Sequence, residues 1–343
     1  MKIAVVGGGV VGLTTALQLQ QELRNSKISV YATDFDNTVS HVAAGIFRIS
    51  SSFSGPSEQI TKTWVKDSYD YYDAIRKSSE AALAGITSIS GYMFANSSPN
   101  TVKSYWIEDI VPLYRRATED EFKLIGGNWK YGSFFTTLLT ECNLYLPWAK
   151  QKLQENGCEF ITKEIQSLKE LASNHDVVMN CTGLGSRELC KDRRLVPIRG
   201  QIIKVQAPWL KTFFYGELDT YIIPGFDGVV TLGGSRGYDS QLQEWCEFEA
   251  AAIRKRCNTL VPSLSSAKTV TRKMGFRPHR ENYVRVEPEG VSTDTGRKLI
   301  VHNYGHGGYG VSTAPGTAKY AVDLAKQIHK GNTIKTVHLT ASL

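Results

Sequence analysis

The sequence predicts an α/β protein with two domains, one built on a parallel sheet and the other an α+β domain with a large, mostly antiparallel sheet. The first observation is the length, because 343 residues exceed the size at which single hydrophobic cores usually stop growing. The second is a buried strand, a glycine-rich turn and a helical pattern at residues 2–23. The third is the strand-like alternation of residues in 197–209, 220–225 and 228–234.

The composition is that of an ordinary globular protein, with 41% hydrophobic and 21% charged residues. The net charge of +7 is spread over short basic clusters, which favours a solvated surface over a nucleic-acid patch and also fits an anionic ligand. The six cysteines lack metal-ligand spacing, so we expect reduced thiols, an intracellular protein and no metal site. No stretch approaches the ~20 apolar residues of a membrane span, so we expect no membrane partner.

The N-terminal turn has the spacing of a dinucleotide-binding fingerprint, Gly7-x-Gly9-x-x-Gly12. In such a Rossmann-type turn the three glycines allow the tight bend, the approach of the pyrophosphate and close helix–strand packing. The next strand ends in Asp34, where an acid would meet a ribose hydroxyl, although Thr33 is an alternative for that position. A tight turn without a nucleotide is the plain alternative, and the pattern alone does not separate NAD from FAD.

Further elements follow along the chain. The apolar spacing predicts helices over 56–83 and 146–157. The segment 175–189 contains a second strand, glycine turn and short helix, which we expect to return the chain to the nucleotide domain. The segment 297–312 leads a strand into a glycine-dense turn, and a helix is expected over 313–330. So many glycines indicate backbone pressed against a ligand, with a flexible surface loop as the alternative.

Several short segments together resemble the D-amino-acid oxidase and D-aspartate oxidase family of FAD flavoproteins, in the family's order and across essentially the whole chain. They are GGGVVGL at the N-terminus, VAAGIF (42–47), NCTGLGSREL (180–189), RGQIIKVQAPW (199–209), YIIPG (221–225), TLGG (231–234), GFRP (275–278) and HNYGHGGYG (302–310). The resemblance favours FAD over NAD as the cofactor. An NAD-dependent or non-enzymatic dinucleotide-binding protein is kept as the remote alternative.

The resemblance implies an FAD domain made of residues 1–50, 146–195 and 286–340, and a substrate domain made of 51–145 and 196–285. It implies a reaction in which a D-amino acid gives up a hydride from Cα to the flavin, with dioxygen as the second substrate and a 2-oxo acid, ammonia and hydrogen peroxide as products. The residues that it places against the cofactor are Gly7, Gly9, Val10, Val11, Gly12, Asp34, Ala43, Ala44, Gly45, Ile165, Thr182, Gly183, Gly307, Gly308, Tyr309, Gly310, Val311 and Ser312.

The same resemblance assigns the substrate-binding groups. Arg277 is expected to hold the α-carboxylate with its guanidinium fork, rather than to be a salt-bridged surface arginine. The Tyr221 hydroxyl is expected to bind the same carboxylate, and the carbonyl of Gly308 to accept from the substrate amine. The family uses no general base, so His306 is expected to be structural.

Two features point to acidic substrates, D-aspartate and D-glutamate. Only residues 210–220 separate two of the motifs, which resembles the shortened lid of D-aspartate oxidases. Arg236 follows the TLGG glycines, where those enzymes resemble one another in an arginine. A second arginine often found in the lid of those enzymes is missing, with Tyr215 or Phe214 near its place, and Arg48 is a candidate substitute or a rim residue. A D-amino-acid oxidase of broad, neutral or basic specificity is the alternative.

Two departures concern the C-terminal part. Ala314, Pro315 and Gly316 stand where the family often has His-Trp-Gly, so the start of the last helix is expected to be altered. Residues 341–343 read Ala-Ser-Leu, which resembles a peroxisomal address without its basic middle residue. The expected location is the peroxisomal matrix, through an import receptor, or the cytoplasm. A homo-oligomer is left open.

Overall fold

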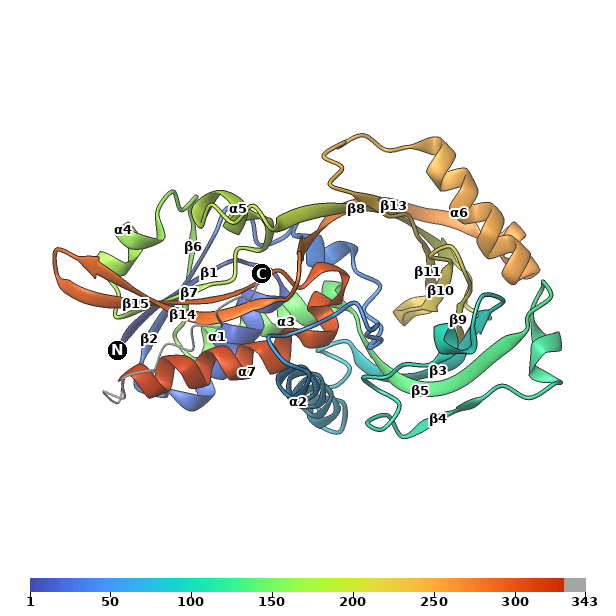
Figure 1. Ribbon diagram of the computed structural model, residues 1–343, viewed down its shortest axis with the longest axis horizontal. Coiled ribbons are helices and arrows are strands. Elements are labelled where there is room, and N and C mark those ends of the chain that lie inside the picture. The colour runs from blue at the N-terminus through green and yellow to red at the C-terminus, as the bar shows by residue number, and fades with distance from the viewer. Residues whose placement is uncertain (330–343) are drawn as a thin grey trace, which may run out of the picture.

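The computed structural model describes residues 1–329 and contains two sheets, which confirms the predicted α/β class with a Rossmann-type domain and a large, mostly antiparallel sheet (Figure 1). The first sheet has six strands in the order β14-β15-β7-β1-β2-β6. All of its neighbouring strands are parallel except the β14–β15 hairpin. Its strands are β1 (Lys2–Val6), β2 (Lys27–Ala32), β6 (Glu159–Thr162), β7 (Val177–Asn180), β14 (Arg285–Thr293) and β15 (Gly296–Tyr304).

Helices cover both faces of this sheet (Figure 1). On one face α1 packs against α3 and α7, and α2 packs against α7; α4 covers the other face. The near-continuous apolar runs of β1 and β7 follow from this arrangement, since a parallel sheet with two covered faces buries every side chain. The helices are α1 (Val10–Glu22), α2 (Glu58–Arg76), α3 (Cys142–Glu155), α4 (Leu168–Ser173), α5 (Ser186–Leu189), α6 (Glu247–Leu260) and α7 (Gly310–His329).

The second sheet has nine strands and curves around the right-hand lobe in Figure 1. Its path runs β12-β8-β11-β10-β9-β3-β5-β4, with β13 paired to β8. Every pair is antiparallel except β3–β9. The strands are β3 (Ile86–Ala95), β4 (Leu113–Arg116), β5 (Tyr131–Thr140), β8 (Leu195–Gln206), β9 (Phe213–Tyr215), β10 (Tyr221–Pro224), β11 (Val229–Gly233), β12 (Gly237–Tyr238) and β13 (Lys268–Arg280).

The alternation along β9 and β10 decides which side chains face the first lobe. Phe214 and Ile222 lie in the hydrophobic cluster beneath α6. Tyr215 and Tyr221 pack instead against the larger cluster that runs through the first lobe. Because successive strand residues point to opposite faces, the two tyrosines lie on the same side of the sheet.

Three predicted helix boundaries were wrong. The helix expected over 56–83 ends at Arg76, because the following residues form turns that lead to Gly85 at φ +63°. The helix expected over 146–157 already begins at Cys142, with Pro147 inside it. The last helix begins at Gly310, not at residue 313, because the glycine turn before it is itself helical. The proposed division into two domains stays a prediction.

Pro315 lies inside α7 without breaking it. A proline lacks the N–H that would bond to the carbonyl four residues earlier, which here belongs to Val311. The Tyr72 hydroxyl, on α2, donates to that carbonyl at 2.8 Å. One residue later, a side chain on Gly316 would place its Cβ 1.9 Å from the carbonyl oxygen of Trp64. The altered Ala-Pro-Gly segment is therefore where α2 and α7 approach most closely.

Candidate functional site

The glycine turns expected to hold the cofactor meet at one edge of the six-stranded sheet. In the strand register, Val6 stands beside both Tyr31 and Asn180, and His302 stands beside Asn180. The four strands are parallel, so the segments that follow them emerge at the same carboxyl edge. Ligands of such sheets bind in the crevice outside that edge.

The first turn has the backbone geometry that only glycine accepts. Gly7 has φ +129°, and a Cβ there would lie 2.3 Å from the carbonyl oxygen of Cys181. A Cβ on Gly12 would lie 1.9 Å from the carbonyl oxygen of Gly7. Gly9 is the N-cap of α1 and has no side chain to cap the helix, although Ser40 Oγ accepts a hydrogen bond from the Val10 amide at 3.0 Å. The helix start is thus left open toward a ligand next to Gly9.

The segment with Ala43, Ala44 and Gly45 lies between the starts of α1 and α7. Gly45 has φ +81° and approaches the backbone of β5 so closely that a Cβ would lie 2.0 Å from the Thr140 carbonyl oxygen. Ser312, in the first turn of α7, donates to the carbonyl of Ile46 at 3.1 Å. The two half-exposed alanines are therefore held beside both helix starts.

The residues present fit an FAD molecule. Neither α1 nor α7, both of which begin within the described residues, carries an acidic side chain in its first turn. A helix N-terminus without acids attracts anionic or electron-rich groups, such as the pyrophosphate at α1 and the flavin ring at α7. In the glycine turn Gly307–Tyr309, which precedes α7, Gly307 is buried and Gly308 is exposed.

The other expected cofactor residues lie in three different segments, each of which follows a strand of the first sheet. Thr182 follows β7, and its hydroxyl lies 2.9 Å from Asn180 Oδ1 and 2.7 Å from Ser186 Oγ. Ile165 follows β6 at the same carboxyl edge and packs on the sheet. Asp34 lies two residues beyond β2, exposed, and its Oδ1 accepts from the amides of the next loop residues. Its contact with a ribose stays a prediction.

Arg277 is held in a slot made by two glycines. Its strand, β13, pairs with β8, and a Cβ on Gly200 of β8 would lie 2.3 Å from Arg277 Nη1. On the other side, a Cβ on Gly308 would lie 3.3 Å from Arg277 Cδ. Nη1 donates to the carbonyl of Ser235 at 3.1 Å, and Arg277 is in no ion pair among residues 1–329. The slot fixes the guanidinium and leaves its charge available to an anion.

Tyr221 lies against the same guanidinium. It stands between Tyr215 and Gly233 in the strand register, and a Cβ on Gly233 would lie 2.3 Å from the Tyr221 hydroxyl oxygen. Burial raises the pKa of Tyr221, against the opposing effect of Arg277. The hydroxyl therefore stays protonated and is able to donate a hydrogen bond to an anion.

His306 lies in the glycine turn but does not face the site as a base. It is 3% exposed, and its Nε2 lies 2.9 Å from Thr317 Oγ1 inside the protein. Burial lowers the pKa of His306 to about 3, so the ring is neutral at physiological pH. A β-bridge joins it to His279 of β13. The backbone of His306 thus joins the glycine turn to the strand that carries Arg277, while its side chain bonds to Thr317 of α7.

The two further arginines are placed differently. Arg236 is 55% exposed and forms an ion pair with Asp219 at 2.9 Å. Arg48 is half-buried, and its guanidinium carbon lies 4.5 Å from the centre of the Tyr215 ring. Neither position tests the predicted contact with a substrate, which stays a prediction for both.

Sequence reasoning did not assign three residues that shape the site. Ser40 accepts the hydrogen bond from the start of α1, and Gly200 leaves room for Arg277. The Tyr215 ring stacks against the Arg48 guanidinium. The signal for Gly200 was available in the RGQ segment, because a glycine inside a strand often marks a close approach. Ser40 and Tyr215 act through contacts that are distant in sequence, so no local pattern marks them.

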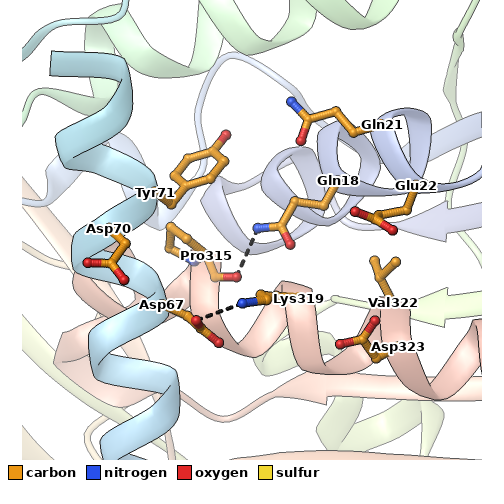
Figure 2. Close-up of a pocket in the computed structure, with 10 residues that line it drawn as sticks. All are labelled: Gln18, Gln21, Glu22, Asp67, Asp70, Tyr71, Pro315, Lys319, Val322 and Asp323. Carbon is orange, nitrogen blue, oxygen red and sulfur yellow. Dashed lines mark hydrogen bonds and ion pairs between the residues drawn. The ribbon is translucent and has the colours of Figure 1, made fainter. Parts of the chain in front are cut away.

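A surface cavity of about 280 Å³ lies elsewhere, between α1, α2 and α7 (Figure 2). None of the expected cofactor or substrate residues lines it. Its polar groups are already paired: Gln18 Nε2 donates to the Pro315 carbonyl at 2.9 Å, and Lys319 pairs with Asp67 at 2.7 Å (Figure 2). We interpret it as a gap between helices beside Pro315, and the crevice at the sheet edge as the candidate site.

A Rossmann-type sheet with glycine turns at its carboxyl edge defines a class, that of dinucleotide-binding proteins, and an arginine and a tyrosine lie in contact beside these turns. Comparison with known proteins makes this specific. The family described as FAD dependent oxidoreductase (DAO) matches residues 2–324. The chain belongs to this family, as an oxidase of the D-amino-acid and D-aspartate oxidase group, and FAD is its cofactor.

Two curated relatives and one solved structure illustrate the similarity. The chain is 38% identical to human D-aspartate oxidase over 329 residues, covering 95% of each chain. It is 32% identical to a D-amino acid oxidase of Dugesia ryukyuensis over 338 residues, 96% of this chain and 98% of the relative. A glycine oxidase from Geobacillus kaustophilus superposes with a TM-score of 0.77 at 17% identity, covering 95% of this chain and 94% of the other.

Three findings complete the description of the site's surroundings. All six cysteines are free thiols. Within residues 1–329 no cluster of histidine, cysteine and acidic side chains is arranged to hold a metal ion. In the same part of the chain no helix is both long and apolar enough to span a bilayer. Residues 341–343, the expected peroxisomal address, lie outside the described residues.

Proposed function

We propose that this oxidase acts on acidic D-amino acids, D-aspartate and D-glutamate, and produces the 2-oxo acid, ammonia and hydrogen peroxide. The observation that carries the proposal is the presence of two further arginines near Arg277, of which Arg48 has no acidic partner among residues 1–329. One guanidinium, that of Arg277, suffices for an α-carboxylate, yet Arg48 and Arg236 lie on neighbouring segments. A second carboxylate in a desolvated pocket needs such a cation, because leaving it unpaired costs several kcal/mol. The identity to human D-aspartate oxidase supports the same conclusion.

The protein's own groups bind and orient the substrate. Arg277 takes the α-carboxylate in a bidentate pair, and Tyr221 donates its hydroxyl to the same group. The carbonyl of Gly308, beside Arg277, accepts from the substrate amine, which fixes the Cα–H bond in one direction. Bound FAD supplies the two-electron acceptor for this bond and passes the electrons to dioxygen. His306 takes no part, since it is buried, neutral and bonded to Thr317.

A broad-specificity D-amino-acid oxidase is the second candidate. The observation that favours it is the Arg236–Asp219 ion pair, which occupies one of the two cations expected for a distal carboxylate. Exposed ion pairs contribute little stability, at about 0–1 kcal/mol, so a substrate could displace Asp219. An acidic substrate would therefore have to displace Asp219 before it could use Arg236.

A panel of D-aspartate, D-glutamate, D-alanine and D-arginine tests the proposal, with peroxide detection and full kinetics for each. Acidic specificity predicts that kcat/KM for D-aspartate exceeds that for D-alanine by about 100-fold, the effect of one well-placed charge pair. Similar values for D-aspartate and D-alanine would favour the broad oxidase instead. The FAD released on denaturation, measured as one equivalent per chain, controls for incomplete loading.

We further propose the peroxisomal matrix as the location, with the cytoplasm as the alternative, because a peroxide-forming oxidase is suited to a compartment that removes peroxide. The discriminating measurement is the distribution of the full chain, carrying an N-terminal fluorescent tag, between peroxisomes and cytosol. A diffuse cytosolic signal in cells with import-competent peroxisomes would contradict the proposal. The oligomeric state stays open.

A further inference from the structure

Arg48 is a half-buried cation without an acidic partner. Among residues 1–329 its side chain is in no ion pair. Its contacts are with uncharged, polarisable groups. The guanidinium carbon lies 4.5 Å from the centre of the Tyr215 ring, and Nε lies 3.2 Å from Met93 Sδ. A buried arginine normally has a carboxylate or several carbonyl partners, since the loss of hydration is otherwise uncompensated. An anion that arrives from outside the chain would compensate it.

The surroundings of Arg48 connect it to the substrate groups. The Tyr215 and Tyr221 rings are 5.9 Å apart, and Tyr221 lies against Arg277. Burial raises the pKa of Tyr215, while the charge of Arg48 opposes this rise and Tyr221 and Tyr309 reinforce it. Arg48, Tyr215, Tyr221 and Tyr309 therefore lie near one another, and Tyr221 joins this group to Arg277.

Tyr309 connects the segment that carries Arg48 to the glycine turn. Its hydroxyl lies 3.0 Å from Ser52 Oγ and is also hydrogen-bonded to Ser50. Ser50 and Ser52 follow Arg48 closely in sequence, so these contacts tie the segment that carries Arg48 to the turn that carries Gly308. Arg48 is thus held in position relative to the turn with Gly308 and, through Tyr215, relative to Tyr221.

Arg236 has the opposite character. It is 55% exposed, and Asp219, itself 40% exposed, already neutralises it at 2.9 Å. Its interaction with a substrate would be screened by solvent, and it would first have to break the ion pair. Of the two arginines, Arg48 is the less solvated and the uncompensated one.

A purely structural role is the competing interpretation of Arg48. A cation stacked on a tyrosine contributes some stability by itself. Glu108 and Arg48 both act on the pKa of Tyr114, which the acid raises and the arginine lowers. The two do not form an ion pair, so Glu108 does not account for the burial of Arg48.

We propose that Arg48, supported by Tyr215, binds the distal carboxylate of the substrate, and that Arg236 is a rim residue held by Asp219. The assignment rests on the proposed acidic specificity of the oxidase. On this assignment Arg48 is the residue that distinguishes D-aspartate from D-alanine. It takes over the role of the missing lid arginine, because the lid has Tyr215 near that position and Arg48 stacks on Tyr215.

Three glutamine variants test the assignment: Arg48→Gln, Arg236→Gln and, as a matched surface control, Arg272→Gln, whose arginine is 49% exposed and paired with Glu247. We expect Arg48→Gln to raise KM for D-aspartate by about 10- to 100-fold, with kcat and the kinetics of D-alanine changed by less than about 3-fold. Arg236→Gln is expected to change KM for D-aspartate by less than about 5-fold. Arg272→Gln should match the wild type.

Ligand binding gives a second readout that does not depend on turnover. Succinate and propanoate are D-aspartate and D-alanine without the amine, so their dissociation constants, measured by calorimetry on the FAD-loaded protein, isolate the distal carboxylate. Arg48→Gln should weaken succinate by the same factor as KM and leave propanoate unchanged. Tyr215→Leu should weaken succinate more than Tyr215→Phe, which keeps an aromatic face for the guanidinium.

Two results would overturn the assignment, and they differ from a failure of the proposed function. If the wild type prefers D-aspartate and Arg48→Gln retains that preference, Arg48 is not the receptor. If Arg236→Gln alone abolishes succinate binding, the receptor is Arg236. A wild type without any preference for D-aspartate over D-alanine would refute the acidic specificity first, and the role of Arg48 with it.

Discussion

The buried histidine of the glycine turn makes a quantitative prediction about pH. In the native protein burial lowers the pKa of His306 from 6.5 to about 3, while in the unfolded chain the ring titrates near 6.5. Between these values the unfolded chain binds one proton more than the native protein, so the free energy of unfolding falls as pH falls. At about pH 5 the loss from this one group is about 2 kcal/mol, and above about pH 7 it vanishes.

His306→Gln isolates this contribution, because glutamine can still bond to Thr317 but does not titrate. Urea unfolding of the FAD-loaded wild type and variant, at about pH 7.5 and about pH 5 with equal excess FAD, gives the four free energies required. The advantage of the wild type over His306→Gln should shrink by about 2 kcal/mol on going to the lower pH. Thr317→Val, which removes the hydrogen bond and keeps the histidine, should preserve the pH dependence. A wild-type advantage that is the same at both pH values would refute the buried, neutral histidine.

Two further predictions concern the cofactor turn and the last helix. Gly12→Ala would place a Cβ 1.9 Å from the Gly7 carbonyl oxygen, so we expect the affinity for FAD to fall by about 30-fold or more. The FAD content of the purified variant is read from its absorbance, and one equivalent per chain would contradict this expectation. Tyr72→Phe removes the donor to the Val311 carbonyl and should lower the free energy of unfolding by about 1–3 kcal/mol in urea titrations. Adding Pro315→Ala supplies a new N–H for that carbonyl, so a double variant no more stable than Tyr72→Phe would refute the compensation.

Backbone constraints made part of the site predictable from the sequence. Gly7 and Gly12 are positions where any side chain would collide with the backbone, and this requirement is visible as a local spacing. The parallel sheet follows from such strand–turn–helix units, and the antiparallel sheet from the alternation after residue 196. Arg277 was singled out through its GFRP motif, but the residues that hold it, Gly200, Gly308 and Ser235, lie in other segments.

Other features depend on contacts that no local pattern encodes. The pairing of Arg236 arises from the loop before β10, where Leu218 and Asp219 both have positive φ and turn the Asp219 side chain toward the neighbouring strand's loop. The stacking of Arg48 on Tyr215 joins segments more than 160 residues apart in sequence. The helix α2 was predicted to end too late, because the sequence beyond Arg76 is compatible with a helix although the chain forms turns there. In each case tertiary contacts decided between alternatives that were locally similar.

The place of β15 in the six-stranded sheet has a consequence for the order of events during synthesis. The turn at Gly7 follows β1, whereas β15, its glycine turn and α7 come roughly 300 residues later in the chain. At about 5–20 residues per second, the interval is roughly 15–60 s. Until then α1 lacks the helix α7 that packs against it. The sheet edge where the glycine turns meet is therefore completed only after nearly all of the described residues have been made.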